Sequence, residues 1–263
     1  MKIATWNVNS LSVRLPQVLD WLAAQKAEGG VDVLALQELK LTDDKFPLAA
    51  FTEAGYQAQW FGQKTYNGVA LISSTEGADL VKNIPGFEDD MSRAIGATYP
   101  DGVGGKVRVI GAYFPNGQAP DSDKFVYKMR WLDALHDWVA SEMQHHPNLV
   151  LLGDYNITFD ALDMWDPVAL AGTIHCTDAE REKLQALIDL GLTDSFRLFE
   201  QPEKSYSWWD YREFAFRRNR GLRIDHILIS EPLKARATAC VIDRAPRKNE
   251  RPSDHAPVVL TLT

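Results

Sequence analysis

The sequence predicts a four-layer α/β sandwich, in which two packed mixed β-sheets are flanked by helices. The first observation is a long series of short apolar segments of strand length, separated by turn-forming residues. The second is a small set of amphipathic helical segments between them. The third is a hydrophobic content of 45% in 263 residues, which is enough for a large buried core.

The predicted strands follow one another along the whole chain, in a number that suggests two packed sheets rather than one. In chain order they are KIATW, VDVLAL, NGVALI, RAIGATY, VRVIGAYF, NLVLLGD, RIDHILI, ATACVI and PVVLTL. The predicted helices lie between them at residues 16–26, 46–54, 124–143 and 177–190. The last helix begins with a capping box, Thr177 to Glu180, and ends before Gly191.

The two halves of the chain resemble each other weakly. The order KIATWNVN, helix, VDVLALQE in the first half matches VRVIGAYFPN, helix, NLVLLGDYN in the second. Each unit is a strand ending near Asn, then a helix, then a strand ending in an acid. Polar side chains therefore gather at strand ends, where the loops of a sandwich converge and binding sites form.

The chain is expected to form a single domain over residues 1–263 and to act in the cytosol. No Ser/Gly-rich or low-complexity linker divides it, and no apolar run is long enough to span a bilayer. The N-terminus lacks the apolar region of a signal peptide. Its two cysteines, Cys176 and Cys240, fit reduced thiols better than a disulfide framework.

The net charge of −8 excludes a protein that coats nucleic acid by overall electrostatics. Any polyanion must meet a local basic segment, and residues 212–223 and 244–251 are both rich in Arg. Trp208, Trp209, Tyr211, Phe214 and Phe216 lie in or just before the first of them. Aromatic side chains among cations favour nucleic-acid contact, although solvated loops are the simpler alternative for any charge run.

Carboxylate and amide side chains follow several of the predicted strands. They are Asn7, Asn9, Glu38, Asp154, Asn156 and Asp225, and Asp254-His255 precedes the last strand. Each one alone could cap a helix or solvate a turn. Together they offer the oxygen ligands that Mg²⁺ prefers, and the lack of a Cys cluster or an HxxxH helix argues against zinc. His226 should point to the opposite face of its strand from Asp225.

The motifs that carry these residues resemble the exonuclease III family of magnesium-dependent DNA-repair nucleases. They are TWNVNS, LALQELK, NGVALIS, YFPNG, LLGDYNI, SWWDYR, NRGLRIDHIL and PSDHAPV, in the family's order and over nearly the whole chain. The resemblance implies a DNase I-like fold and hydrolysis of phosphate esters at DNA 3' ends, as a 3'-5' exonuclease and 3'-phosphatase or phosphodiesterase. It also implies some cleavage 5' to abasic sites.

The resemblance assigns a role to each residue of the site. Glu38 would bind Mg²⁺, or Mn²⁺ in its place, with Asn7 and Asp154 in the metal site and Asp254 serving the metal or its surroundings. Asp154 would also orient or deprotonate the attacking water. Asn156 would hold the phosphate or the nucleophile, and Tyr113 would contact the phosphate. His255 would hydrogen-bond a phosphate oxygen, with Asp225 orienting it and favouring its charged form.

The family's DNA contacts match a further set of positions. Trp209, Phe214 and Leu222 resemble family positions that wedge or line the site, although some relatives carry a larger aromatic residue in place of Leu222. With the cations of the first basic segment, the full set of expected DNA contacts is Asn116, Lys128, Trp209, Arg212, Phe214, Arg217, Arg218 and Leu222. His175 occupies a position that is usually small in abasic endonucleases of the family. It would either fill the pocket for an extruded abasic sugar and favour reactions at 3' ends, or turn away and leave that pocket open.

The expected partner is double-stranded DNA with an abasic site, a nick or a blocked 3' end, with no membrane and a monomeric state. Three alternatives remain open at this point. One is a general abasic-site endonuclease. Another is a phosphatase of the same superfamily that acts on a small or lipid phosphate. The last is a DNA-binding regulator without catalysis, which the full set of site residues disfavours.

Overall fold

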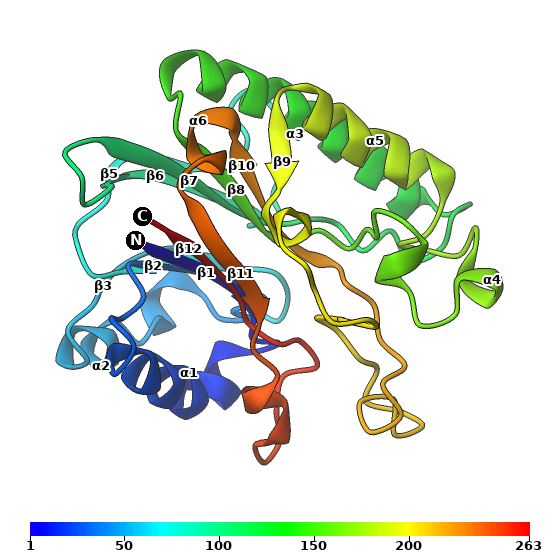
Figure 1. Ribbon diagram of the computed structural model, residues 1–263, viewed down its shortest axis with the longest axis horizontal. Helices are drawn as coiled ribbons and strands as arrows, with labels where there is room; N and C mark the ends of the chain where they lie inside the picture. Colours follow the sequence, from blue (N-terminus) through cyan, green and yellow to red (C-terminus); the bar gives the residue numbers. More distant parts are fainter.

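The computed structural model describes residues 1–263 and contains two six-stranded sheets that pack face to face (Figure 1). The first sheet has the order β11 (Ala237–Ile242), β12 (Val258–Leu262), β1 (Lys2–Asn7), β2 (Val33–Gln37), β4 (Val69–Ser73), β3 (Gln57–Phe61). The second has the order β5 (Ala78–Lys82), β6 (Ala94–Pro100), β7 (Lys106–Tyr113), β8 (Leu149–Asp154), β10 (Asp225–Ser230), β9 (Leu192–Asp194).

Helices cover the outer face of each sheet and complete the predicted four layers. The helices α1 (Leu11–Lys26) and α2 (Leu48–Glu53) pack on the first sheet, and α3 (Asp123–His145) and α5 (Asp178–Asp189) on the second (Figure 1). The short helices α4 (Pro167–Leu170) and α6 (Glu231–Lys234) lie in connecting segments. Short 3₁₀ turns span Asp43–Lys45, Ala161–Asp163, Ser195–Leu198 and Ala245–Lys248.

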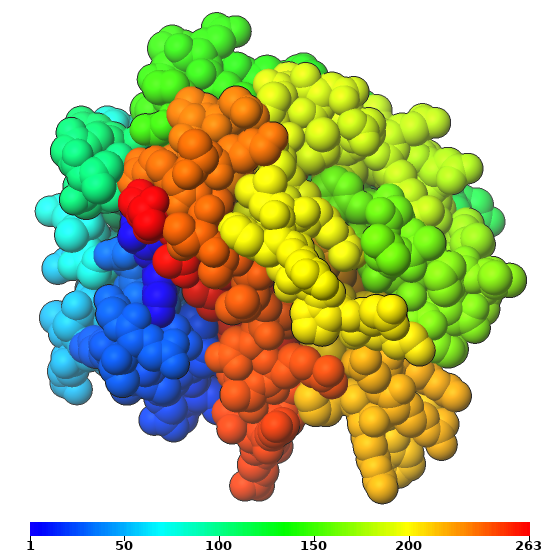
Figure 2. All heavy atoms as spheres, in the orientation of Figure 1, coloured from blue at the N-terminus to red at the C-terminus, as the bar shows by residue number.

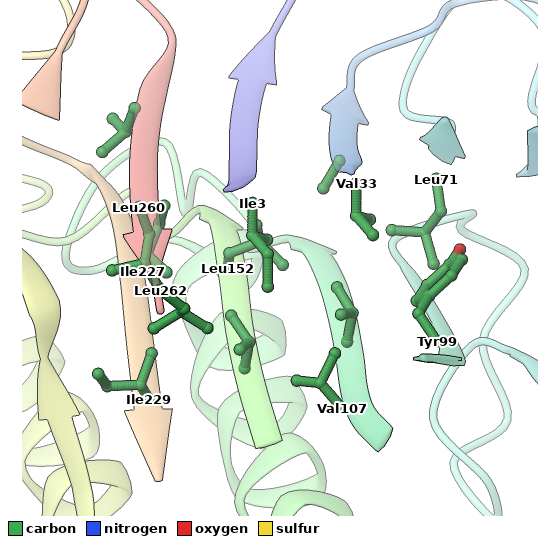
Figure 3. Packing of buried hydrophobic residues seen from close by; sticks show 14 of the residues in the cluster. Ile3, Val33, Leu71, Tyr99, Val107, Leu152, Ile227, Ile229, Leu260 and Leu262 are labelled. Atoms are coloured by element: carbon green, nitrogen blue, oxygen red, sulfur yellow. The ribbon is translucent and has the colours of Figure 1, made fainter. Parts of the chain in front are cut away.

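Alternation of side chains along the strands builds the core between the sheets. Successive residues of a strand point to opposite faces, so every second residue enters the space between the two sheets. Figure 3 shows the result: Ile3, Val33 and Leu71 of the first sheet meet Leu152 and Ile227 of the second. The intervening residues of the same strands pack under the helices, which gives each sheet a second apolar layer.

The weak internal similarity corresponds to two equivalent units. The strands β1 and β2 are parallel and joined by α1, and β7 and β8 are parallel and joined by α3. The carboxyl ends of all four strands therefore lie at the same end of the sandwich. Both predicted β-helix-β units are confirmed, and the predicted capping box of α5 is present between Thr177 and Glu180.

Two predictions about the elements were wrong. The first helix begins at Leu11 rather than Pro16, because the buried Leu11 and its backbone bond to Leu39 fix an earlier start, so that Pro16 lies inside the helix. Strands β3, β5 and β9 were not predicted. Each lies at an edge of its sheet, and β3 and β5 lack the buried apolar residues that reveal a central strand, while β9 has only three residues.

Both cysteines are buried free thiols. None of the helices combines the length and the apolar character needed to cross a bilayer.

The end of strand β8, which carries Asp154, depends on Gly153. Its φ is +150°, and a Cβ there would lie 1.8 Å from the carbonyl oxygen of Ala112. We predict that Gly153→Ala lowers the free energy of unfolding by about 3 kcal/mol or more, because backbone must move. Gly172→Ala is the matched control, since Gly172 has a φ of +73° but open space around it. Gly172→Ala should lower the free energy of unfolding by only about 1 kcal/mol, measured by denaturant unfolding. Equal losses for the two variants would contradict the steric account.

Candidate active site

The candidate site lies where the space between the two sheets opens at the carboxyl ends of the parallel strands. Asn7 continues the inward series of Ile3 on β1, and Asp154 continues that of Val150 and Leu152 on β8. Tyr113 is the last residue of β7. It pairs with Asp154, which also pairs with Asp225 at the start of β10. The alternation that buries the apolar core thus also brings the polar side chains together.

Asn7 joins the two sheets through its side-chain amide. Its Nδ2 donates to Glu38 Oε1 at 3.0 Å and to Asp154 Oδ2 at 2.8 Å, while its Oδ1 accepts from the backbone N–H of Asn9. The amide nitrogen of Asn7 therefore faces the two carboxylates. In this geometry Asn7 positions Glu38 and Asp154.

Glu38 lies in a turn just beyond β2, with a φ of +54°. Its Oε2 is 3.0 Å from Lys40 Nζ, and Lys40 also donates to Asn9 Oδ1. Lys40 was not singled out from the sequence, although it stands two residues after Glu38 in LALQELK. The ion pair limits the positions that the Glu38 carboxylate can take at the mouth of the site.

His255 is held by a buried carboxylate from the opposite sheet. Its Nδ1 donates to Asp225 Oδ2 at 2.8 Å, and both side chains are buried. Burial disfavours charge on the ring, but Asp225 and Asp154 outweigh this effect and raise the pKa of His255 to about 10. His255 is therefore an imidazolium at neutral pH, with Nε2–H available as a donor.

The Asp154 carboxylate lies beside the Nε2–H donor of His255, and its own environment favours the neutral, protonated form. Its Oδ2 is 3.7 Å from His255 Nε2, a distance that leaves the ring's N–H free for another acceptor. Burial raises the pKa of Asp154, and the negative charge of Asp225 raises it further. The positive charge of His255 lowers it, and the pKa of Asp154 is about 7. A carboxylate with this pKa can accept a proton near neutral pH.

The donor set fits a hard divalent cation. Glu38, Asp154 and His255 present ligand atoms that all lie within 4.8 Å of one another. Because His255 is protonated, the two carboxylates are the effective ligands, and Mg²⁺ commonly binds one or two carboxylates together with water and phosphate oxygens.

Asp254 lies outside this group of ligand atoms. It accepts from Asn9 Nδ2 at 3.0 Å and from Trp208 Nε1 at 2.9 Å. Its place is therefore in the surroundings of the metal site, one of the two roles the resemblance allowed. Trp208, whose importance the SWWDYR motif alone could not show, fixes the loop that carries His255.

Asn156 and Tyr113 complete the floor of the site. Asn156 has a φ of +50°, and its Nδ2 donates to the Phe114 carbonyl at 3.0 Å. The exposed Asn116 lies 3.4 Å away, donating to Asn156 Oδ1. Burial and the charges of Glu38 and Asp154 hold the pKa of Tyr113 well above its usual range, so its hydroxyl remains protonated.

His175 lies against this floor rather than turning away from it. Its Nδ1 is 2.7 Å from the carbonyl oxygen of Asn156, which can only accept, so Nδ1 carries the hydrogen. Burial and the neighbouring Lys128 lower the pKa of His175 to about 4, and the ring is neutral at pH 7. Nε2 consequently carries the lone pair.

Three of the predicted DNA contacts, Lys128, Trp209 and Leu222, have buried side chains. Lys128 is fully buried and donates to Glu180 Oε1, to the Asn156 carbonyl and to the Asn116 carbonyl. Trp209 is fully buried, with its Nε1 bonded to Asn219. Leu222 is 5% exposed and packs among the apolar residues behind Trp208.

The other predicted DNA contacts stay available. Arg212, Phe214, Arg217 and Arg218 are exposed on one protruding loop. His226 points away from the site, as predicted, with its ring against Tyr155 and Phe159.

Comparison with known proteins shows the family to which the chain belongs. The model of the endonuclease/exonuclease/phosphatase family matches residues 4–255. Exodeoxyribonuclease III of Haemophilus influenzae is 34% identical over 269 residues, covering 98% of each chain. The chain belongs to this family. Its similarity to exodeoxyribonuclease III makes it an exonuclease III-type member, a hydrolase of DNA phosphodiester bonds.

Two solved structures share the fold of this exonuclease III-type chain over its whole length. The 3' phosphatase NExo from Neisseria, bound to product DNA hairpin, is 47% identical with a TM-score of 0.94, and 99% of that chain is covered. An AP endonuclease from Archaeoglobus fulgidus is 34% identical with a TM-score of 0.92, again with 99% covered. The fold prediction, two mixed sheets flanked by helices, is confirmed.

The charged state of His255 can be tested by NMR of the six histidine rings. With a chelator present, we expect His255 to stay protonated past pH 8 and titrate near pH 10, while His175 and His226 titrate near pH 4. Asp225→Asn should lower the pKa of His255, because the main opposite charge is removed. A wild-type His255 that titrates near the unperturbed value of about 6.5 would contradict the assignment.

The same pair should make stability depend on pH. The folded pKa of His255 is about 10, above the unfolded value. The contribution of His255 to the free energy of unfolding is therefore fully present below about pH 6.5, and it is lost as the pH rises through the folded pKa. Chemical denaturation across this window should show a smaller alkaline loss in Asp225→Asn than in the wild type.

Proposed function

We propose that this protein is a Mg²⁺-dependent DNA-repair nuclease that hydrolyses phosphate esters at DNA 3' ends. Its activities would be those of a 3'-5' exonuclease and a 3'-phosphatase or phosphodiesterase. The observation that carries the proposal is the close placement of the Asp154 carboxylate beside the His255 ring, which Asp225 holds, and beside the carboxylate of Glu38. Hydrolysis of a phosphate ester needs a base, a cationic donor to the phosphate oxygens and a cation site in one place.

The residues divide the chemistry between them. Glu38 and Asp154 would hold Mg²⁺, or Mn²⁺ in its place, and the ion would neutralise charge on the phosphate oxygens and favour ionisation of water. Asp154 accepts the proton of the attacking water. His255, fixed by Asp225, donates Nε2–H to a non-bridging phosphate oxygen, and Tyr113 and Asn156 would contact the same phosphate.

A preference for ends over internal abasic sites is supported by His175. The ring is fixed against the Asn156 carbonyl, and the backbone N–H of His175 is held by Glu180, so the side chain has little freedom to move aside. Such a ring takes space beside the phosphate site that an extruded sugar would need. A solved structure of high similarity is named as a 3' phosphatase bound to product DNA hairpin.

Double-stranded DNA with a nick or a blocked 3' end is the proposed substrate. The exposed Arg217, Arg218 and Phe214 stand on a loop beside the site and suit a nucleic acid better than a small or lipid phosphate. A regulator without catalysis would have no use for the paired Asp154 and His255. Action in the cytosol as a monomer remains a prediction.

The proposal can be tested with matched duplexes, one carrying a nick with a 3'-phosphate and one an internal abasic site. We expect Mg²⁺-dependent removal of the 3'-phosphate and weak cutting at the abasic site, with no reaction in chelator. Asp154→Asn should reduce removal of the phosphate by about 10³-fold or more, since the base is lost. Equal activity of the two proteins, or hydrolysis of a small phosphate monoester that duplex DNA does not inhibit, would contradict the proposal.

Replacement of His175 tests the origin of the preference. His175 has a φ of +73°, so His175→Gly relieves backbone strain and should fold. We predict that this variant cleaves the abasic duplex about tenfold faster, with removal of the 3'-phosphate changed less than about twofold. His175→Asn, which tolerates the same φ and retains a polar side chain, should give an intermediate rate. Unchanged abasic cleavage in both variants would show that the ring does not restrict the pocket.

A further inference from the structure

Two loops project from the edge of the molecule at which the site opens. We call residues 210–221 the first prong and residues 244–251 the second prong. In Figure 2 they protrude side by side at the lower edge, the first in gold and the second in orange-red, with a notch between their tips. The first prong carries Arg212, Phe214, Arg217 and Arg218, which already have a proposed role in DNA contact. The second prong has no assigned role.

The second prong is held to the first by stacked cations. The guanidinium of Arg244 lies 5.2 Å from the ring centre of Trp209 and 5.1 Å from that of Phe216. That of Arg247 lies 4.7 Å from the ring centre of Phe216. Arg247 is buried and also donates to the carbonyl of Ser253, two residues before His255. The packing therefore joins both prongs to the loop that carries the catalytic histidine.

The helix α1 fixes the other side of the second prong. Arg14 donates to the carbonyl of Arg251 at 3.1 Å and to that of Pro252 at 3.1 Å. Gln17 donates to the carbonyl of Glu250 at 2.9 Å. With both sides anchored, the backbone of the prong is a fixed projection, which limits the backbone entropy lost on binding.

Several exposed cations of the prongs have no acidic partner, whereas Arg212 pairs with Asp210. Lys248 and Arg251 on the second prong, and Arg217 and Arg218 on the first, form no ion pair with a carboxylate. The chain as a whole is acidic, with 36 acidic and 28 basic residues, so the prongs form a local basic region on an acidic protein. Such a cluster suits a polyanion with regularly spaced charges.

We infer that the second prong binds the phosphate backbone of duplex DNA next to the cleaved ester, through Lys248 and Arg251. Arg251 is four residues from His255, so the chain between them spans at most about 14 Å. Phosphates of one strand follow at about 3.4 Å along the duplex axis, which places the contact within about four nucleotides of the reacting phosphate. The inference rests on the proposed function, because it takes DNA as the substrate.

The test is a double variant, Lys248→Ala/Arg251→Ala, in the full chain. Binding to a duplex with a recessed 3' end is measured in chelator at several salt concentrations. We expect affinity at 0.1 M salt to fall about tenfold or more, and the slope of log K against log salt to become shallower by about two. Lys106→Ala/Lys234→Ala removes the same charge at the opposite end of the second sheet and should change neither quantity. Lys248→Arg/Arg251→Lys, which keeps the charge, should bind like the wild type.

Two results would overturn the inference: unchanged affinity and slope in the double variant, or an equal loss in the control, which would indicate overall charge alone. The catalytic outcome is separate. Neither Lys248 nor Arg251 touches the catalytic residues, so the double variant should show a higher KM with kcat within about twofold. A wild-type protein that binds the duplex through the prong yet leaves every 3' end intact would refute the proposed function and leave this inference standing.

Discussion

Two polar contacts across the sheet interface are the constraint on which the rest of the site depends. Asn7 of the first sheet donates to Asp154 of the second at 2.8 Å, and His255 beside the first sheet donates to Asp225 of the second at 2.8 Å. Both contacts are buried, and both lie at the end of an otherwise apolar interface. A buried polar group without a partner is costly, so these contacts fix how the sheets meet at this end.

The chemistry follows from the protonation states that these contacts favour in His255 and Asp154. Asp225 favours the charged form of His255, while burial favours the neutral form of Asp154, so an acid and a base stand side by side near neutral pH. Glu38 is held by Asn7 and Lys40, and it adds a second carboxylate beside the pair formed by Asp154 and His255. A rigid scaffold of this kind needs little rearrangement when a phosphate arrives.

Much of the site could be predicted because strand alternation is visible in sequence. Asn7, Asp154 and Asp225 continue the inward-facing series of apolar residues, and His226 falls on the opposite face for the same reason. What could not be predicted depends on contacts between distant segments. Lys128 and Trp209 were expected to contact DNA, yet their side chains are buried, where Lys128 Nζ donates to Glu180 and Trp209 Nε1 donates to Asn219. Edge strands such as β5, with mostly exposed residues, give no comparable pattern.

The most direct test of the account is a crystal structure of the Asp154→Asn protein with Mn²⁺ and a hairpin that ends in a 3'-phosphate, with the ion located by anomalous scattering. The account predicts an ion on Glu38 at the end of the sheet interface, with the terminal phosphate against His255 and the ring of His175 beside it. An ion away from Glu38, or a phosphate that does not meet His255, would contradict the view that the cross-sheet contacts build the hydrolytic site.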